Sequence, residues 1–115
     1  MQIQKAAVKL LKLSPSVRVV TVCDKNGKVV YSAHSRRVRN LLTKKESMTS
    51  LRLATQAWKV RKSFARRLGQ CKYVVAEYGR IKRITMPAGK DHLFYITTSV
   101  AYDHNKIIHT ARRFR

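Results

Sequence analysis

Apolar and cationic residues alternate along residues 43–69 with a period that predicts one long amphipathic helix. At about 100° per residue, the apolar residues fall on one side of this helix. They are Leu53, Ala54, Ala57, Trp58, Val60, Phe64, Ala65 and Leu68. The cations of the other side are Lys45, Arg52, Lys59, Lys62 and Arg66, with Arg67 at its margin. We expect the apolar face to pack in the core and the cationic face to point to solvent.

Both ends of this segment carry helix signals. Thr43 and Glu46 have the spacing of a capping box, in which each side chain bonds a backbone N–H group at the helix start. Gly69 follows the last turn, where a C-terminal glycine belongs. Arg61 is an exception within the helix, because it falls in the apolar arc. It either extends to solvent or meets a carboxylate at an interface.

The rest of the hydrophobic pattern predicts two shorter helices and a set of strands. Residues 2–13 are amphipathic and end at Ser14-Pro15, because proline removes a backbone donor and restricts the residue before it. Asp103 is placed to cap a final helix. Runs rich in β-branched and aromatic residues predict strands at 17–23, 29–34, 72–78, 81–86 and 92–100. Asn26-Gly27 has the residue types of a hairpin turn.

This order of elements, α-β-β-α-β-β-β-α, predicts an α/β protein of the α+β type with one domain over residues 1–115. Two hairpins and a three-strand meander form an antiparallel sheet of five strands. The long helix must cross between the second and third strands. The terminal helices are then left to cover a face of the sheet.

Charge adds a strong expectation about partners. The chain has 26 Lys and Arg against 5 Asp and Glu, a formal net charge of +21. Such self-repulsion favours a polyanionic partner, which is DNA, RNA or an anionic membrane surface. A solubilising charge excess is the alternative. The candidate phosphate contacts are Arg36, Arg37, Arg39, Lys45, Arg52, Lys59, Lys62, Arg66 and Arg67, with Arg112, Arg113 and Arg115 as further candidates.

The sequence contains no recognisable catalytic or metal-binding constellation. Its five carboxylates are scattered, and most stand in predicted turns or caps. His104 and His109 are five residues apart, whereas a zinc pair on a helix usually stands at i and i+4. Cys23 and Cys71 lack a CxxC spacing, which indicates two reduced, buried thiols in a cytosolic protein. We expect no enzyme activity, no cofactor and no metal.

Two stretches resemble the roadblock family of dynein light-chain-like proteins, within the longin and profilin-like architecture. They are EYGRIKRITMPAGKDHLFYITTSV, residues 77–100, and VVTVCDKNGKVVYS, residues 19–32. The resemblance extends over nearly the whole chain and is greatest to small archaeal roadblock-like proteins. It implies a non-catalytic protein that dimerises, as a homodimer or with a related subunit. It also implies a scaffold for small GTPases, or a subunit of motor or lysosomal-surface complexes.

Carried onto this chain, the resemblance places the dimer face on the third strand and part of the 44–68 helix. The strand residues are Lys72, Tyr73, Val74, Val75, Ala76, Glu77 and Tyr78. Pairing this strand makes physical sense, because an unpaired apolar edge invites aggregation. The high positive charge departs from the family and favours an acidic partner.

Two functions remain at this point. The first is a cytoplasmic nucleic-acid-binding protein that contacts phosphates, either as an architectural DNA-binding protein or in association with ribosomes. The alternative is a scaffold subunit of a larger protein or membrane-associated complex, whose basic face meets acidic subunits or anionic lipid. Residues 1–13 discriminate between them: they form either a membrane-surface helix or an integral part of the domain, which is the simpler expectation. No apolar run reaches the roughly 18 residues that span a bilayer.

Overall fold

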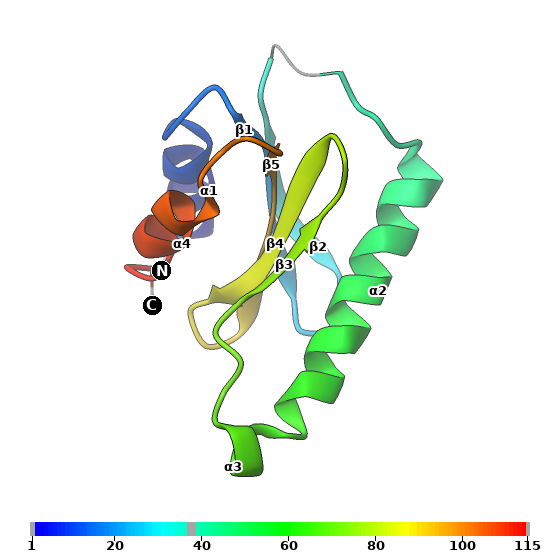
Figure 1. The fold of residues 1–115 in the computed structure, drawn as a ribbon, viewed down its shortest axis with the longest axis vertical. Helices are drawn as coiled ribbons and strands as arrows, with labels where there is room; N and C mark the ends of the chain where they lie inside the picture. Colours follow the sequence, from blue (N-terminus) through cyan, green and yellow to red (C-terminus); the bar gives the residue numbers. More distant parts are fainter. Residues whose placement is uncertain (1, 37–38, 115) are drawn as a thin grey trace.

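An antiparallel five-stranded sheet with strand order β2-β1-β5-β4-β3 forms the centre of the computed structural model, which describes residues 2–36 and 39–114 (Figure 1). This arrangement confirms the predicted α+β fold and its order of elements. The elements are α1 (Ile3–Leu11), β1 (Val17–Asp24), β2 (Val29–His34), α2 (Lys44–Lys62), α3 (Ala65–Leu68), β3 (Val74–Glu77), β4 (Ile81–Ala88), β5 (His92–Ser99) and α4 (His104–Ala111).

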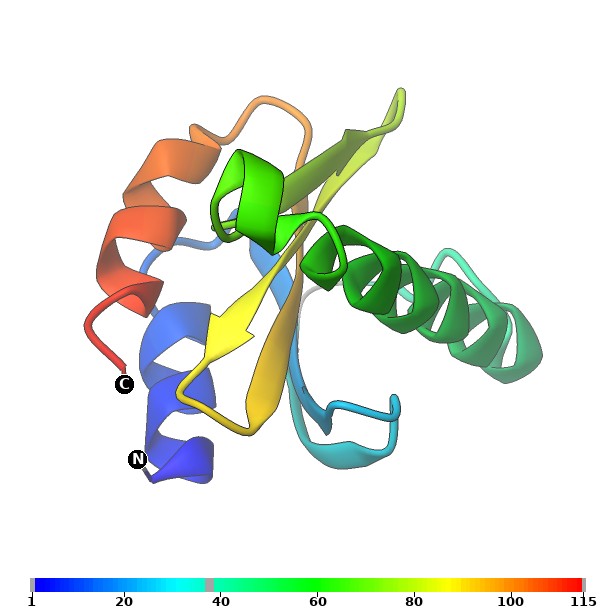
Figure 2. The same cartoon turned by 90° about the horizontal axis from the view of Figure 1, so that it is seen from below.

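The helices cover the two faces of the sheet unequally. Helices α1 and α4 lie side by side on one face, and α2 crosses the other (Figures 1 and 2). The larger core lies under α1 and α4, where Leu10 and Ile107 pack with Phe94 of the sheet and all three are fully buried. Burying one such side chain contributes about 1.5–3 kcal/mol. A smaller cluster lies under α2 and contains Cys23, Leu51, Trp58 and Leu93.

The turn between β1 and β2 brings the sheet close to α2. Asp24 accepts hydrogen bonds on Oδ1 from the backbone N–H groups of Asn26 (2.9 Å) and Lys28 (3.0 Å). Gly27 has φ 87°, in the left-handed region that favours glycine. A Cβ atom at Gly27 would lie 3.0 Å from Oγ1 of Thr55 in α2. Glycine is therefore required here both for the turn and for the approach of the helix.

The long helix is shorter than predicted. It starts with the expected capping box, because Thr43 Oγ1 accepts from the N–H of Glu46 and Glu46 Oε1 accepts from the N–H of Thr43. It ends at Lys62 instead of continuing to Gly69, since the N–H of Ser63 bonds the Val60 carbonyl three residues back. The Ser63 hydroxyl donates to the same carbonyl, and such local bonds compete with the helical pattern. The short α3 then ends at Gly69, with φ 81°.

The other boundaries differ by a few residues. β3 begins at Val74, later than the predicted residue 72, and β4 extends to Ala88. Pro87 therefore lies within β4, opposite Leu93 of β5. The predicted N-cap of the last helix is confirmed, because Asp103 Oδ1 accepts from the N–H of Asn105 at 3.0 Å.

Candidate functional site

The side of α2 that meets the sheet is not the predicted one. Leu51, Thr55 and Trp58 are buried. The hydroxyl of Thr55 donates to the carbonyls of Leu51 and Arg52, so this polar residue is buried with its hydrogen bond satisfied. A prediction that assigns only apolar residues to the core therefore misses Thr55. The helix is consequently rotated relative to the expectation, and it meets the sheet along a narrow line.

The predicted core face of α2 and α3 is largely exposed, which corrects the prediction. Leu53 is 67% exposed, Val60 57%, Phe64 51% and Leu68 81%. Of the predicted set, Trp58 alone is fully packed, and the three alanines are half-buried. Four large apolar side chains exposed along α2, the bend after it and α3 are unusual for a surface segment, and exposed apolar patches mark interaction sites. We call Leu53, Val60, Phe64 and Leu68 the apolar row.

Leu53, the first residue of the apolar row, lies beside the edge strand β3, because both line one cavity. β3 ends the sheet and pairs only with β4 among the described residues, so its outer backbone groups have no strand partner. A cavity of about 150 Å³ separates β3 from α2, and Leu53, Ala57 and Arg61 line its helix side. Its strand side includes Val74, Ala76 and Tyr78. Arg61 therefore lies at the border of this apolar surface, with its side chain exposed.

The strand residues predicted for the dimer face divide between two sides of the sheet. Val74, Ala76 and Tyr78 line the cavity beside α2. Val75 packs against the core under α1 and α4, and the Tyr73 ring lies 5.6 Å below the Arg112 guanidinium. Lys72 and Glu77 are exposed. This alternation is the period of two that a strand imposes.

The predicted phosphate contacts are exposed but do not form a single row. Arg37 and Arg115 lie outside the described residues. The bend at Ser63 carries Arg66 and Arg67 onto α3, away from the axis of α2. Among the described residues the only ion pair joins Lys25 and Asp91, at 3.7 Å. The remaining exposed candidates are Arg36, Arg39, Lys45, Arg52, Lys59, Lys62, Arg112 and Arg113.

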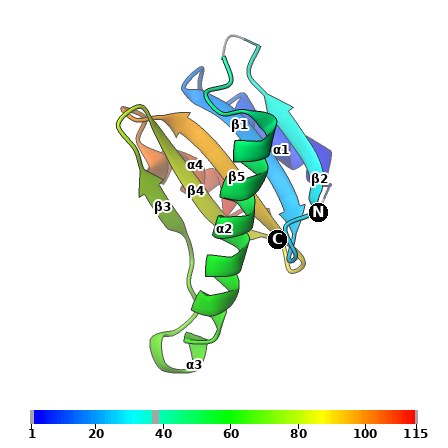
Figure 3. The ribbon, with the colours of Figure 1, turned by 90° about the vertical axis from the view of Figure 1, so that its right-hand side faces the viewer.

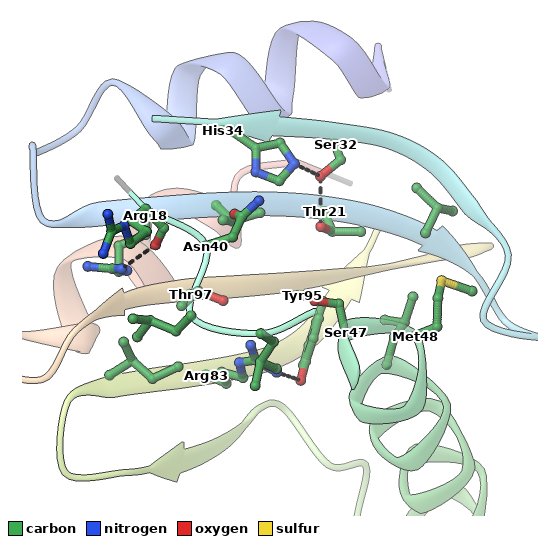
Figure 4. Close-up of a pocket in the computed structure, with 17 residues that line it drawn as sticks. Arg18, Thr21, Ser32, His34, Asn40, Ser47, Met48, Arg83, Tyr95 and Thr97 are labelled. Carbon is green, nitrogen blue, oxygen red and sulfur yellow. Dashed lines mark hydrogen bonds between the residues drawn. The ribbon is translucent and has the colours of Figure 1, made fainter. Parts of the chain in front are cut away.

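A second cavity, of about 210 Å³, lies on the sheet beneath the N-terminal half of α2 (Figure 4). Nη1 of Arg83 donates to Ser50 of α2 and to the Tyr95 hydroxyl, which is 3.0 Å away. Its guanidinium also lies 5.4 Å from the Tyr95 ring centroid. Nε of Arg83 is buried without a partner in the described part of the chain. Arg83 thus links α2 to the sheet through hydrogen bonds, and its guanidinium adds a positive charge to the lining of this cavity.

Within residues 2–36 and 39–114, no three of His, Cys, Asp and Glu stand close enough to hold a metal ion. Burial raises the pKa of the Cys23 thiol to about 11, so this group stays protonated. Backbone hydrogen bonds lower the pKa of Asp24, Glu46 and Asp103, which serve the turn and the two caps.

The first helix is an integral part of the fold. Ala6, Ala7 and Leu10 of α1 are fully buried against the sheet, so the apolar side of α1 is occupied. In the described part of the chain, no helix combines the length and apolar character that a membrane crossing requires.

The sequence matches no family model and no curated protein sequence. Solved structures, in contrast, are closely similar. The gliding protein MglB of Thermus thermophilus superposes with a TM-score of 0.78 at 14% identity, covering 96% of this chain and 80% of that one. A Roadblock/LC7 domain of Streptomyces avermitilis gives 0.74 at 14% identity, with 96% and 88% covered. MglC of Myxococcus xanthus gives 0.65 at 8% identity, with 99% and 93% covered. The chain has the Roadblock/LC7 fold.

Proposed function

We propose that this protein is a non-enzymatic roadblock-type scaffold that acts as a dimer. The observation that carries the proposal is the unpaired edge of β3 with the exposed Leu53 of the apolar row beside it. An exposed apolar patch at a free strand edge is a liability for a protein that stays alone. A second copy of the chain removes that liability, because a two-fold axis sets the same patch of each copy against the other.

The dimer joins two kinds of surface in one interface. The outer edge of β3 pairs with its counterpart and makes the two sheets continuous, while the apolar rows of the two copies pack together. Leu53 and Tyr78 supply large apolar side chains beside the β3 edge, and Phe64 supplies another after the C-terminal end of α2. Large buried side chains carry much of the energy of an interface. Arg61 lies at the border, where a carboxylate of the other copy or of a further partner has room to meet it.

The experiment is a measurement of mass in solution for matched variants. The wild type should sediment as a dimer, and the double variant Leu53→Glu/Phe64→Glu as a folded monomer, because its buried charges oppose each other across the axis. Val30→Glu is the control: Val30 is exposed on β2, the opposite edge strand. A monomeric wild type, or a dimer broken by Val30→Glu and not by the double variant, would refute the proposed interface.

What the dimer holds together follows from the resemblance and from the charge. The resemblance implies a scaffold for a small GTPase or a subunit of a larger complex. The net charge of +21 favours an acidic surface on that partner, since complementary charge steers association.

The second candidate function is binding of nucleic acid through its phosphates. The protein would then be an architectural DNA-binding protein or a ribosome-associated protein. The support for this candidate is the exposure of Lys45, Arg52, Lys59 and Lys62 along α2, at spacings of one or two turns. The test is binding to duplex DNA and structured RNA across a salt series. A steep decrease of affinity with salt, abolished by Lys59→Glu/Lys62→Glu/Arg66→Glu, is the expected result. Weak binding to both polymers at about 50–200 mM salt would exclude this candidate.

A further inference from the structure

Three segments that are distant in the sequence meet at one end of the sheet and enclose a cavity of about 510 Å³. They are the β1–β2 turn, the C-terminal end of α2 with the chain that follows it, and the β4–β5 turn. Figure 3 shows both turns at the same end of the sheet, beside the C-terminal half of α2. The volume lies within the range of about 300–1,000 Å³ that is typical of small-molecule sites.

Each of the three segments contributes cations to the lining. Lys25 comes from the first turn, Lys59 and Lys62 from α2, and Lys90 from the second turn, and His92 at the start of β5 also lines the cavity. No Asp or Glu lines this cavity among the described residues. Bringing four ammonium groups around one space is unfavourable unless an anion binds there.

The carboxylates of the two turns neutralise the cluster only in part. Asp91 is 81% exposed and forms its one ion pair in the described part of the chain with Lys25, at 3.7 Å. Asp24 is occupied by the two backbone N–H groups of its own turn. Lys62 and Lys90 have no ion-pair partner among the described residues. Lys59 is held in place, because its Nζ donates to Oδ1 of Asn26 at 3.1 Å.

Part of the cavity lining is apolar. It includes the buried Trp58 and Leu93 and the exposed Pro87. Trp58 and Leu93 belong to the small core under α2, so their positions are fixed by packing. A ligand that fits both parts carries several negative charges on one end and an apolar or aromatic body on the other.

We propose that this cavity binds a small phosphorylated ligand with an aromatic body, as in a nucleoside di- or triphosphate. Four ammonium groups match the several charges of a polyphosphate, whereas a single carboxylate would neutralise only one of them. The aromatic body lies on the Trp58 side of the cavity. This site goes beyond the scaffold function and does not depend on it, because none of Leu53, Val60, Phe64, Leu68 and the β3 residues lines the cavity.

The experiment uses Trp58, the only tryptophan of the chain, as its reporter. Adenosine triphosphate is titrated into the full-length protein at about 100 mM salt, where the Debye length is about 10 Å and distant charges are screened. We expect saturable quenching of Trp58 fluorescence. Removal of three ligand contacts in Lys59→Ala/Lys62→Ala/Lys90→Ala should weaken binding about tenfold or more.

The matched control is Lys5→Ala/Lys9→Ala/Lys12→Ala on α1, which removes the same charge from the other face of the sheet. These lysines are exposed in both sets, so each variant should fold, and circular dichroism verifies this. The control should change the affinity less than about twofold, since remote charges act only through the screened field. Equal weakening in both variants, or the absence of saturable quenching in the wild type, would overturn the proposal. The mass measurement of the dimer reports the scaffold proposal separately.

Discussion

The two faces of the sheet have different roles. The face under α1 and α4 holds the larger core, in which Leu10, Phe94 and Ile107 are fully buried. The face under α2 is covered along a narrow line by Leu51, Thr55 and Trp58. The first face supplies most of the stability of the fold. The second leaves both the apolar row and three cavities accessible, and it is therefore the face on which partners and ligands are expected to act.

The largest expected change in the free energy of unfolding comes from a substitution in the core under α1 and α4. Phe94→Ala removes a fully buried ring and should lower the free energy of unfolding by about 3–5 kcal/mol. Leu53→Ala, on the exposed row of α2, should change it by less than about 0.5 kcal/mol under conditions where the protein is monomeric. Urea unfolding followed by circular dichroism measures both. Similar losses for the two variants would mean that the faces are equally important for stability.

A smaller decrease in the free energy of unfolding is expected from a substitution in the β1–β2 turn, where α2 approaches the sheet. Gly27→Ala places a Cβ atom 3.0 Å from Thr55 Oγ1 and also strains a residue with φ 87°. It should cost about 1–3 kcal/mol of unfolding free energy. Gly69→Ala is the matched control, since Gly69 has a similar φ of 81° but no atom within 4 Å of its added Cβ. A larger loss in Gly27→Ala than in Gly69→Ala, whose backbone has ψ 171°, would show that the contact with α2 adds to the backbone strain. A smaller loss in Gly27→Ala would contradict this expectation.

The smallest expected decrease in the free energy of unfolding comes from a substitution at the start of α2. Thr43→Ala removes the N-cap and should lower the free energy of unfolding by about 1 kcal/mol. Hydrogen bonds from the backbone and side chain of Thr43 lower the pKa of Glu46. The folded state therefore binds the proton of Glu46 less readily than the unfolded state does.

That stabilisation is present above the usual glutamate pKa of about 4.3, and it decreases as the pH falls through the lowered value. Thr43→Ala should accordingly lose part of the wild-type pH dependence below about pH 4.3. Unfolding curves at several acidic pH values check this, with Thr49→Ala within the same helix as control. An unchanged pH dependence in Thr43→Ala would show that the Thr43 side chain does not lower the pKa of Glu46, since the variant keeps the backbone N–H group of residue 43.

The sequence by itself determined the element order, the antiparallel sheet and the local signals at element ends. The capping box of Thr43, the cap of Asp103 and the turn at Asn26-Gly27 were all predicted, because each depends on residues a few positions apart. The roadblock resemblance likewise rested on contiguous stretches, and the fold agrees with it. The phosphate-contact set and the dimer strand stay predictions.

Only the tertiary structure decided which side of α2 meets the sheet. Helical periodicity groups residues by angle, but it does not state which group the sheet will contact, and Thr55 is buried because its hydroxyl finds carbonyl partners in its own helix. The break at Ser63 depends on a side-chain bond that competes with the helix. The cationic cavity joins residues 25, 59, 62 and 90, which only the folded chain brings together.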